Sequence, residues 1–310
     1  MSTSPFRRYG RATICRAALM MIIAALSGGA ASGGEACGVP WSSLTLQAAR
    51  LGSTATVKVE IEVLSAATES PKFLDSPKGE PLQVSGSEVQ RLSVATTLDI
   101  LGGQRIRLEN HLWVDPFTNA PLYLVRTRFG LKDYHQQFRF TREGVFRRQR
   151  EPATVGEMAK PPDAWTRIGQ NFYPYPDGRA GCLAIVETSQ LIPLAEALGA
   201  EAAGDLSPLC VFHKRQAHRV SVQTQLPQLV HFNYLEKRSD GETRRTGTVS
   251  APGVLFASRP IGSYRGSVED FLRDGTRIYF SPAGSLPLLA IGELPIIGRV
   301  EMTLKEVFLY

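Results

Sequence analysis

The sequence predicts a mainly β protein made of antiparallel strands with one or two short helices. Apolar and polar residues alternate over several segments, which is the pattern of strands with one buried and one solvated face. Glycine pairs and prolines separate these segments, as expected where a strand turns back beside its neighbour. Helical signals are confined to two short stretches in the second half of the chain.

The clearest strand runs from Thr56 to Val63, where every second residue is apolar and the others are polar or charged. The same rhythm predicts strands at Leu92–Leu98 and Arg105–Val114, with Gly102 and Gly103 as the turn between them. The strands expected after these lie at Tyr123–Phe129, around Phe138–Phe140, and at Val145–Arg150, with Glu143 and Gly144 forming the last hairpin turn.

Strands resume in the last third of the chain and complete the predicted sheet. In the final strand the alternation slips by one residue before Val307, which indicates a β-bulge. The predicted segments are Val220–Thr224, Val230–Lys237, Gly247–Phe256, Thr276–Phe280 and Arg299–Leu309.

The middle of the chain interrupts this pattern. Residues 151–181 are rich in proline and glycine and predict a long ordered loop over the sheet, held by Trp165, Phe172, Tyr173 and Tyr175. A short helix is expected at Leu191–Leu198, with Thr188 or Ser189 at its start and Gly199 at its end. One further helical turn is expected at 267–272, where Ser267 begins a capping box.

The N-terminal segment has the pattern of a secretory signal peptide. Four arginines precede the apolar run Ala17–Leu26, and small residues follow it. Cleavage is expected after Ala30, Ala31 or Ala36, so residues 1–36 form the signal and 37–310 the mature β-rich domain. We therefore expect the periplasm as the location, with lipid attachment at Cys37 as an alternative that the preceding acidic residue disfavours.

Composition narrows the classes of partner. The formal net charge is +6, but the four arginines of the signal account for most of it, and 31 basic and 29 acidic residues remain after residue 34. This near balance gives no electrostatic argument for nucleic acid. No segment of the mature chain reaches the roughly 20 apolar residues that a spanning helix needs, so no transmembrane span is expected.

The cysteines predict one disulfide. Cys15 leaves with the signal, and in an oxidising compartment Cys182 and Cys210 are the expected pair, with Cys37 left over. The alternative is that all three remaining cysteines are small apolar core residues.

Two turns share a pattern of proline, four residues, then Pro-Leu. The first begins at Asp115 and Pro116 and ends at Pro121, and the second contains Pro282 and Pro287. In each, the first proline favours a type I turn and the second opens the next strand, where its missing N–H does least harm. The repeat suggests two related sheet halves, about 54–150 and 205–310, joined by a loop and a short helix.

These turns also carry a family resemblance. The passage DPFTNAPLYLVRTRF at 115–129 with FRFTREGVFRR at 138–148 resembles a hairpin of bacterial envelope proteins of the half-barrel type, such as the lipoprotein carriers LolA and LolB. The C-terminal part is similar to an uncharacterised branch of exported proteins, at Leu286, Pro287, Leu288, Leu294, Pro295, Gly298, Arg299 and Val300. The resemblance implies a strongly curved antiparallel sheet, a half-barrel or open barrel, and assigns no catalytic residue.

No motif for a named chemistry occurs. The nucleophile elbow, the phosphate-binding loop, the zinc-protease motif and Cys-x-x-Cys are absent from the sequence, and we expect no cofactor, metal or catalytic residue. His213 and His218 are spaced poorly for a shared metal ion. An unrecognised hydrolase would require His111, His135 and Asp115 in one cleft, although Asp115 is expected to cap its proline turn.

Three groups of basic residues are interpreted as solvated strand faces and turn flanks, with attraction to anionic lipid head groups or envelope polymer as the alternative. They are Arg147, Arg148 and Arg150; Lys214, Arg215 and Arg219; and Arg244 and Arg245.

Two functions remain open. The first is an exported protein that binds an apolar ligand or lipid in its curved sheet, provided that the helix at 191–198 leaves part of the concave side unfilled. The second is a structural or interaction protein of the envelope that docks a protein partner. The first is preferred.

Overall fold

The structure is a computed structural model of the 310-residue chain. It describes residues 39–175, 185–199, 209–213, 215–260, 275–282, 286–294 and 297–310. The strands are β1 (Trp41–Arg50), β2 (Ser53–Ser65), β3 (Glu88–Ile100), β4 (Gln104–Val114), β5 (Pro121–Phe129), β6 (Tyr134–Phe140), β7 (Gly144–Glu151), β8 (Arg167–Pro174), β9 (Ile185–Glu187), β10 (Leu209–His213), β11 (Gln216–Arg238), β12 (Gly241–Pro260), β13 (Thr276–Phe280), β14 (Pro287–Leu294) and β15 (Gly298–Leu309).

Helices are short in the described part of the chain. The α-helices are α2 (Ala66–Glu69), α3 (Val155–Met158) and α4 (Leu191–Gly199), and the 3₁₀ helices are η1 (Ser70–Lys72), η2 (Pro162–Ala164) and η4 (Thr188–Gln190). None of the helices in these ranges has both the length and the apolar character needed to cross a membrane.

All fifteen described strands belong to one sheet. Its order is β8-β7-β6-β5-β4-β3-β2-β1-β15-β14-β13-β12-β11-β10-β9, so nearly every strand lies beside its neighbour in the sequence. The pairing of β1 with β15 joins the two ends of the described chain. Neighbours in this order are antiparallel except β9 and β10. The predicted fold class, a curved antiparallel sheet of the open-barrel type with few short helices, is confirmed.

One part of the sheet closes on itself. Strands β11 to β15 pair in succession, and β15 also pairs with β11 at Leu235–Glu306, Glu236–Val307 and Lys237–Phe308. Because five strands of alternating direction begin and end with the same direction, the closing pair must be parallel, as it is. The eight strands β1–β8 stay outside this ring.

Local sequence explains the tight connections. Leu51 and Gly52 link β1 to β2 as a two-residue turn, and both have positive φ, at 50° and 75°. This is the type I′ geometry whose twist matches the strands on either side. Gly102 and Gly103 also have positive φ where β3 turns into β4, as the predicted turn at these glycines requires.

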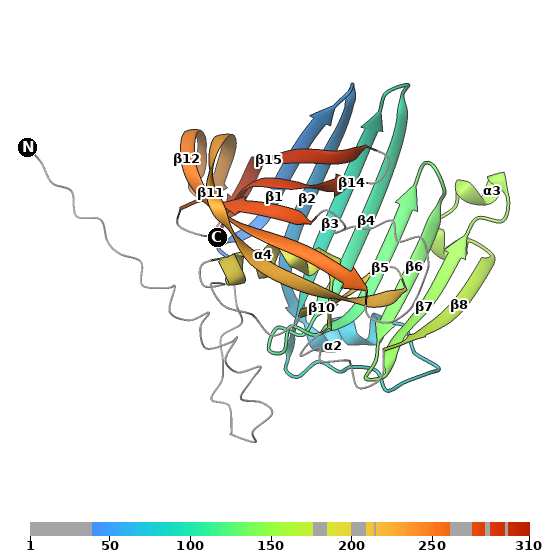
Figure 1. Cartoon of the computed structure of the whole chain (residues 1–310). Coiled ribbons are helices and arrows are strands. Elements are labelled where there is room, and N and C mark those ends of the chain that lie inside the picture. The colour runs from blue at the N-terminus through green and yellow to red at the C-terminus, as the bar shows by residue number, and fades with distance from the viewer. Residues whose placement is uncertain are drawn as a thin grey trace, which may run out of the picture.

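The sheet curls so that its second half lies against the concave side of its first half. Figure 1 shows β1–β8 as a broad curved layer with β10–β15 running across it. Strand β9 contacts β5, η4 contacts β3, and α4 contacts β12 and β13. The main hydrophobic core fills the space between these layers and takes residues from both.

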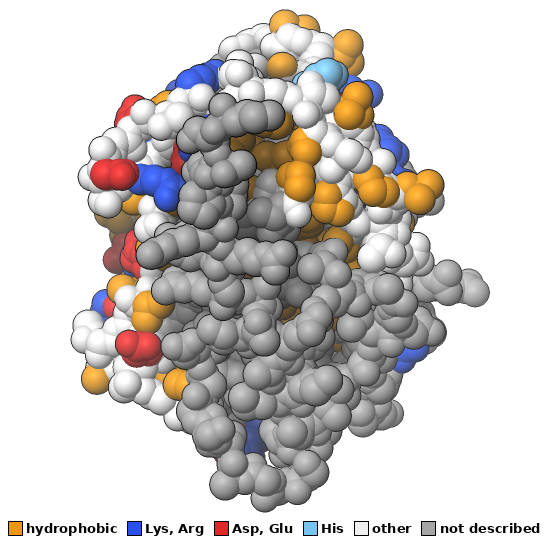
Figure 2. All heavy atoms as spheres, turned by 90° about the vertical axis from the view of Figure 1, so that its left-hand side faces the viewer, with side chains coloured by type: hydrophobic (Ala, Val, Ile, Leu, Met, Phe, Trp, Pro, Cys, Tyr) orange, Lys and Arg blue, Asp and Glu red, His pale blue; other side chains and the backbone are white. Residues whose placement is uncertain are grey.

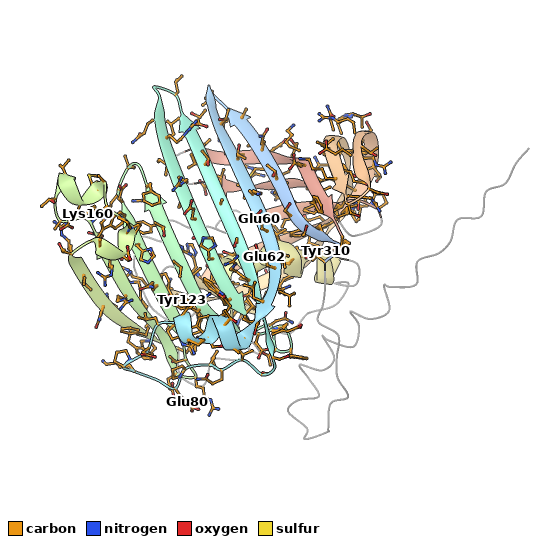
Figure 3. The ribbon with its side chains drawn as sticks, turned by 180° about the vertical axis from the view of Figure 1, so that it is seen from behind. Glu60, Glu62, Glu80, Tyr123, Lys160 and Tyr310 are labelled. Carbon is orange, nitrogen blue, oxygen red and sulfur yellow. The ribbon has the colours of Figure 1, made fainter. Side chains whose placement is uncertain are left out.

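Short helices and loops cover parts of the convex face, which Figure 3 shows from behind with Tyr123 labelled. The segment with α2 and η1 covers a second cluster built from Val89, Trp113, Leu122 and Tyr123, and Phe73 from this segment packs against it. The segment with α3 and η2 brings Trp165, which is fully buried, against Phe129 of β5.

Several predicted boundaries are corrected. The expected loop at 151–181 contains strand β8, because Arg167–Pro174 pairs along the whole of β7. The segments predicted at Val220–Thr224 and Val230–Lys237 form one strand, β11, which continues through Pro227 by a register shift between Gln225 and Gln228. The predicted bulge in β15 is confirmed, since the register with β1 shifts at Lys305.

Some predictions lie outside the described residues. These are the signal peptide, Cys37 and the helical turn at 267–272. The division into two related sheet halves stays a prediction.

Candidate ligand-binding site on the concave face

Cross-strand pairing arranges the concave side chains of β2–β7 in rows. One row is apolar and buried as far as β6, and then ends on a charged residue of β7, Arg147. Its members before Arg147 are Ile61, Leu92, Leu112, Leu124 and Phe138. This row belongs to the main core between the two layers.

The neighbouring positions on the same face are less well covered. Along β3, Leu92 and Leu98 are buried, but Val94 and Thr96 between them are half-buried. Along β4, Leu108 and Asn110 are half-buried in the same way, between Ile106 and Leu112. We call Val94, Thr96, Leu108, Asn110 and their neighbour Arg126 the inner patch.

The inner patch lies where the hydrophobic core is interrupted. The main core lies on one side of it, and a smaller cluster formed by Ala48, Ala55, Leu98, Ile106 and Val300 lies on the other. Half-buried Met302 packs against both clusters. Inward side chains at the centre of a sheet are normally fully covered, so their remaining accessible surface marks incomplete packing.

An ion pair between half-buried Arg126 and buried Glu187 borders the inner patch. Nη2 of Arg126 lies 3.1 Å from Oε1 of Glu187, and its Nε donates to Oδ1 of Asn110 at 3.1 Å. Glu187 is 1% exposed and also accepts hydrogen bonds from Thr188 Oγ1 and the Ser189 amide. The guanidinium therefore has a carboxylate partner whose other lone pairs are also satisfied.

A capping box places this carboxylate. The Glu187 side chain caps η4. The Gln190 side chain accepts a hydrogen bond from the Glu187 amide and donates one to the carbonyl of Asn119. The sequence pattern predicts the helix start at Thr188 or Ser189 and does not by itself assign the cap to Glu187. The Glu-x-x-Gln spacing at 187–190 was the signal that could have indicated it.

Aromatic rings join the two layers beside Arg126. Phe212 of β10 packs edge-on against Phe138 and Phe140 of β6, with ring centroids 6.3 Å and 5.9 Å apart, and lies 6.2 Å from Tyr173 of β8. Arg126 stacks over the Phe138 ring at 5.7 Å. These rings fix the end of the sheet that carries β9 and β10 against β5–β8.

Arg147 of β7 lies beside the Phe138 ring, on the side opposite to Arg126 of β5. It is the cross-strand partner of Phe138, it is 8% exposed, and its guanidinium lies 5.4 Å from the ring centroid of Tyr173. Within the described ranges it has no ion pair or hydrogen bond, and its buried Nε has no partner. Burial lowers the pKa of Arg147, and the charge of Arg215 acts in the same direction. The interpretation of Arg147 as solvated is wrong.

The predicted turn residues lie at the ends of strands, away from the inner patch. Asp115 Oδ1 accepts from the amide of Phe117, and Oδ2 accepts from the amide of Ser85, which makes Asp115 a buried cap of the turn that contains Pro116. Pro121 begins β5, Pro287 begins β14, and Pro282 lies in the turn after β13.

The three residues of the hydrolase hypothesis lie apart. His111 and His135 point to the convex face from β4 and β6, where they bond to Ser93 and Thr127. They are not cross-strand partners across β5, because His111 lies opposite Val125 and His135 opposite Thr127. Burial lowers the pKa of both histidines. Asp115 is occupied in its turn, so no triad forms.

Two other predicted features are only partly described. Cys210 is fully buried and is not a free thiol, whereas Cys182 lies outside the described residues, so their pairing stays a prediction. His213 and His218 have ring centroids 6.2 Å apart. The described ranges contain no group of three or more metal-binding side chains.

Comparison with known protein families and with curated proteins finds no match for this sequence. Among solved structures, the chain is similar to a beta-barrel-like protein of domain of unknown function DUF1849 from Brucella abortus. The TM-score is 0.45 with 10% sequence identity, over 88% of this chain and all of that chain. That description names no ligand or activity, and the resemblance to LolA and LolB stays a prediction.

Proposed function

We propose that this chain is an exported periplasmic protein that binds an apolar or lipid ligand on the concave face of its sheet. The observation that supports the proposal is the inner patch, where the core between the two layers is interrupted. Val94 and Leu108 provide apolar surface there, and Asn110 and Thr96 provide hydrogen-bonding groups. A mostly apolar surface with a few fixed polar groups is typical of ligand sites.

The physical advantage of such a ligand follows from the half-buried side chains. An apolar chain placed against Val94, Leu108 and Met302 would remove their remaining surface from water. Each methylene buried in this way contributes about 0.8 kcal/mol. Strands β3, β4 and β15, which carry Val94, Leu108 and Met302, hold these side chains within the sheet, so little ordering would oppose binding.

Mass spectrometry of gently purified protein tests the proposal, and we expect a bound lipid or acyl compound. Val94→Trp and Thr96→Phe fill the inner patch from β3, and each should weaken the binding of a fluorescent fatty acid at least tenfold. Ala95→Trp is the matched control, because Ala95 lies on the same strand but is exposed on the opposite face. Absence of any bound lipid together with no binding of the probe would contradict the proposal.

Export has its own test. We expect the protein in the periplasmic fraction, with its first residue following Ala30, Ala31 or Ala36. A chain that retains its leader and stays in the cytosol would contradict this part of the proposal.

A second candidate is an interaction protein of the envelope. Figure 2 shows hydrophobic side chains exposed on the upper part of the face that carries β11 and β12. At the register shift in β11, Leu226 is 90% exposed and Leu229 is 65% exposed. A photo-crosslinker at Leu226 should then capture one protein in intact cells, whereas a crosslinker at exposed Thr243 on β12 should not.

A further inference from the structure

Arg147 has properties that the fold does not require. We propose that Arg147 binds the acidic head group of the ligand, a carboxylate or a phosphate ester, while the apolar part lies along the concave face toward the inner patch. This inference rests on the function proposed above and names the chemical class of its ligand.

Buried Arg139 and half-buried Arg126 show how a structural arginine is compensated in this sheet. Arg139 is 6% exposed and donates to the carbonyls of Leu122 at 2.7 Å and Leu82 at 2.9 Å. Arg126 has Glu187 and Asn110. Within the described residues, the guanidinium of Arg147 interacts only with the ring face of Tyr173, and its Nε is buried without a hydrogen-bond partner.

The cost of burying a charge makes this difference significant. Removing a charged side chain from water is costly even after relaxation of the protein. A cation–π contact such as that with Tyr173 offsets only part of this cost. The buried Nε of Arg147 is therefore left without a hydrogen-bond partner, and a carboxylate or phosphate group that accepts from two N–H groups of the guanidinium would supply the missing interaction.

The electrostatic surroundings favour an anion. The positive charge of Arg215, in the turn between β10 and β11, also acts on Arg147. Among the carboxylates that the structure describes, Glu151 acts on Arg147, and it is itself paired with Arg167 and bonded to Gln149. The positive potential is thus not cancelled locally.

Position links Arg147 to the proposed ligand. Its cross-strand neighbour on β8, Asn171, is exposed, so solvent reaches the concave face next to it. Arg147 lies two strands from Arg126 and four strands from Val94, about 10 Å and 19 Å at the usual strand spacing. The row that contains Phe138 and Leu124 is filled by the core, so a chain anchored at Arg147 would follow the next row on the same face, where Gln149, Gln136 and Arg126 are half-buried and lead to Asn110 and Val94.

Three probes of equal chain length test the role of Arg147. Dodecanoate, dodecyl phosphate and dodecanol are titrated into the mature protein by calorimetry, with acetate and inorganic phosphate as free anions. We expect both acidic amphiphiles to bind at least tenfold more tightly than the alcohol. Arg147→Met should abolish this preference and leave dodecanol unchanged, and Arg147→Lys should retain part of it.

Arg148→Met is the matched control, because Arg148 is the next residue on β7 and bonds to Gln137 on the opposite face. It should leave all three affinities unchanged. The ligand-free Arg147→Met protein should melt at or above the temperature of the wild type, since it loses no hydrogen bond.

The outcomes separate the two proposals. A protein that binds none of the three amphiphiles contradicts the proposed function itself. Equal binding of dodecanoate and dodecanol, or an unchanged preference in Arg147→Met, overturns only the role of Arg147. Acetate or inorganic phosphate that binds as tightly as dodecanoate would assign the residue to a free anion and overturn the head-group proposal.

Discussion

Arg126 and Arg147 lie on the two sides of Phe138 on one face of one sheet, yet they are compensated in different ways. Arg126 stacks over the ring and pairs with Glu187, a carboxylate delivered by β9 and held by the cap of η4. Arg147 is the cross-strand partner of the same ring, and within the described chain it pairs with no carboxylate.

The two arginines differ in whether a segment from the other layer brings a carboxylate to them. The segment with β9 and η4 crosses the concave face at β5, so its carboxylate reaches Arg126. The neighbouring strand β10 brings an aromatic ring, Phe212, to the side of Arg147. Arg126 is therefore paired with a carboxylate of the protein itself, whereas the guanidinium of Arg147 stays available to the anion proposed above.

One of the two largest expected effects comes from removing the charge that compensates Arg126. Glu187→Gln leaves the half-buried guanidinium of Arg126 without its carboxylate and weakens the cap of η4, so we expect a loss of about 3 kcal/mol of unfolding free energy. Urea denaturation measures it. Adding Arg126→Met should recover most of the loss, because the unpaired charge is then gone.

An exposed pair serves as the control for this measurement. Nζ of Lys237 lies 3.7 Å from Oε1 of Glu242, and the Glu242 side chain is 59% exposed. Glu242→Gln should cost less than about 1 kcal/mol. If Glu187→Gln costs no more than this control, the contrast between the two arginines has no energetic basis.

The other large loss of stability is expected when the predicted disulfide bond to β10 is removed. Cys210 lies on β10 two residues before Phe212, and its predicted partner is Cys182. Loss of the bridge in Cys182→Ser should lower the unfolding free energy by about 3–4 kcal/mol under oxidising conditions. Under reducing conditions the variant and the wild type should unfold at the same urea concentration. Equal stability without reductant would show that Cys182 forms no bridge.

The smallest expected change in stability comes from two histidines on the convex face, His111 of β4 and His135 of β6. Burial is the main reason why the pKa values of His111 and His135 lie below the ordinary value. Near and below pH 6.5 the unfolded chain takes up protons that the native state does not, so stability falls as the solution is acidified. Stability should be constant above this pH.

The check is the urea midpoint of the wild type and of His111→Gln/His135→Gln at pH 7.5 and 5.5. We expect a smaller drop in the double variant than in the wild type. An identical drop in both proteins would contradict the assignment of this pH dependence to the two histidines.

The fold was largely predictable from local patterns, and the site was not. Alternation at Thr56–Val63 and the turn at Gly102–Gly103 are readable because each depends only on neighbouring residues. Strand β8 was missed because its residues are mostly exposed and lack alternation. Arg147 stands in a run of basic residues that resembles a solvated face, and its burial depends on Tyr173 and on Phe138, which packs against Phe212 of the other layer.

Alternation along the chain was enough to predict antiparallel strands and the location of many of them, because side chains of neighbouring residues in a strand point to opposite faces. The folded chain was needed to show how far the sheet curls, that β11 and β15 pair in parallel, and which inward side chains stay partly uncovered. These depend on contacts between residues far apart in the chain. The same separation explains why one arginine beside Phe138 obtains a carboxylate and the other does not.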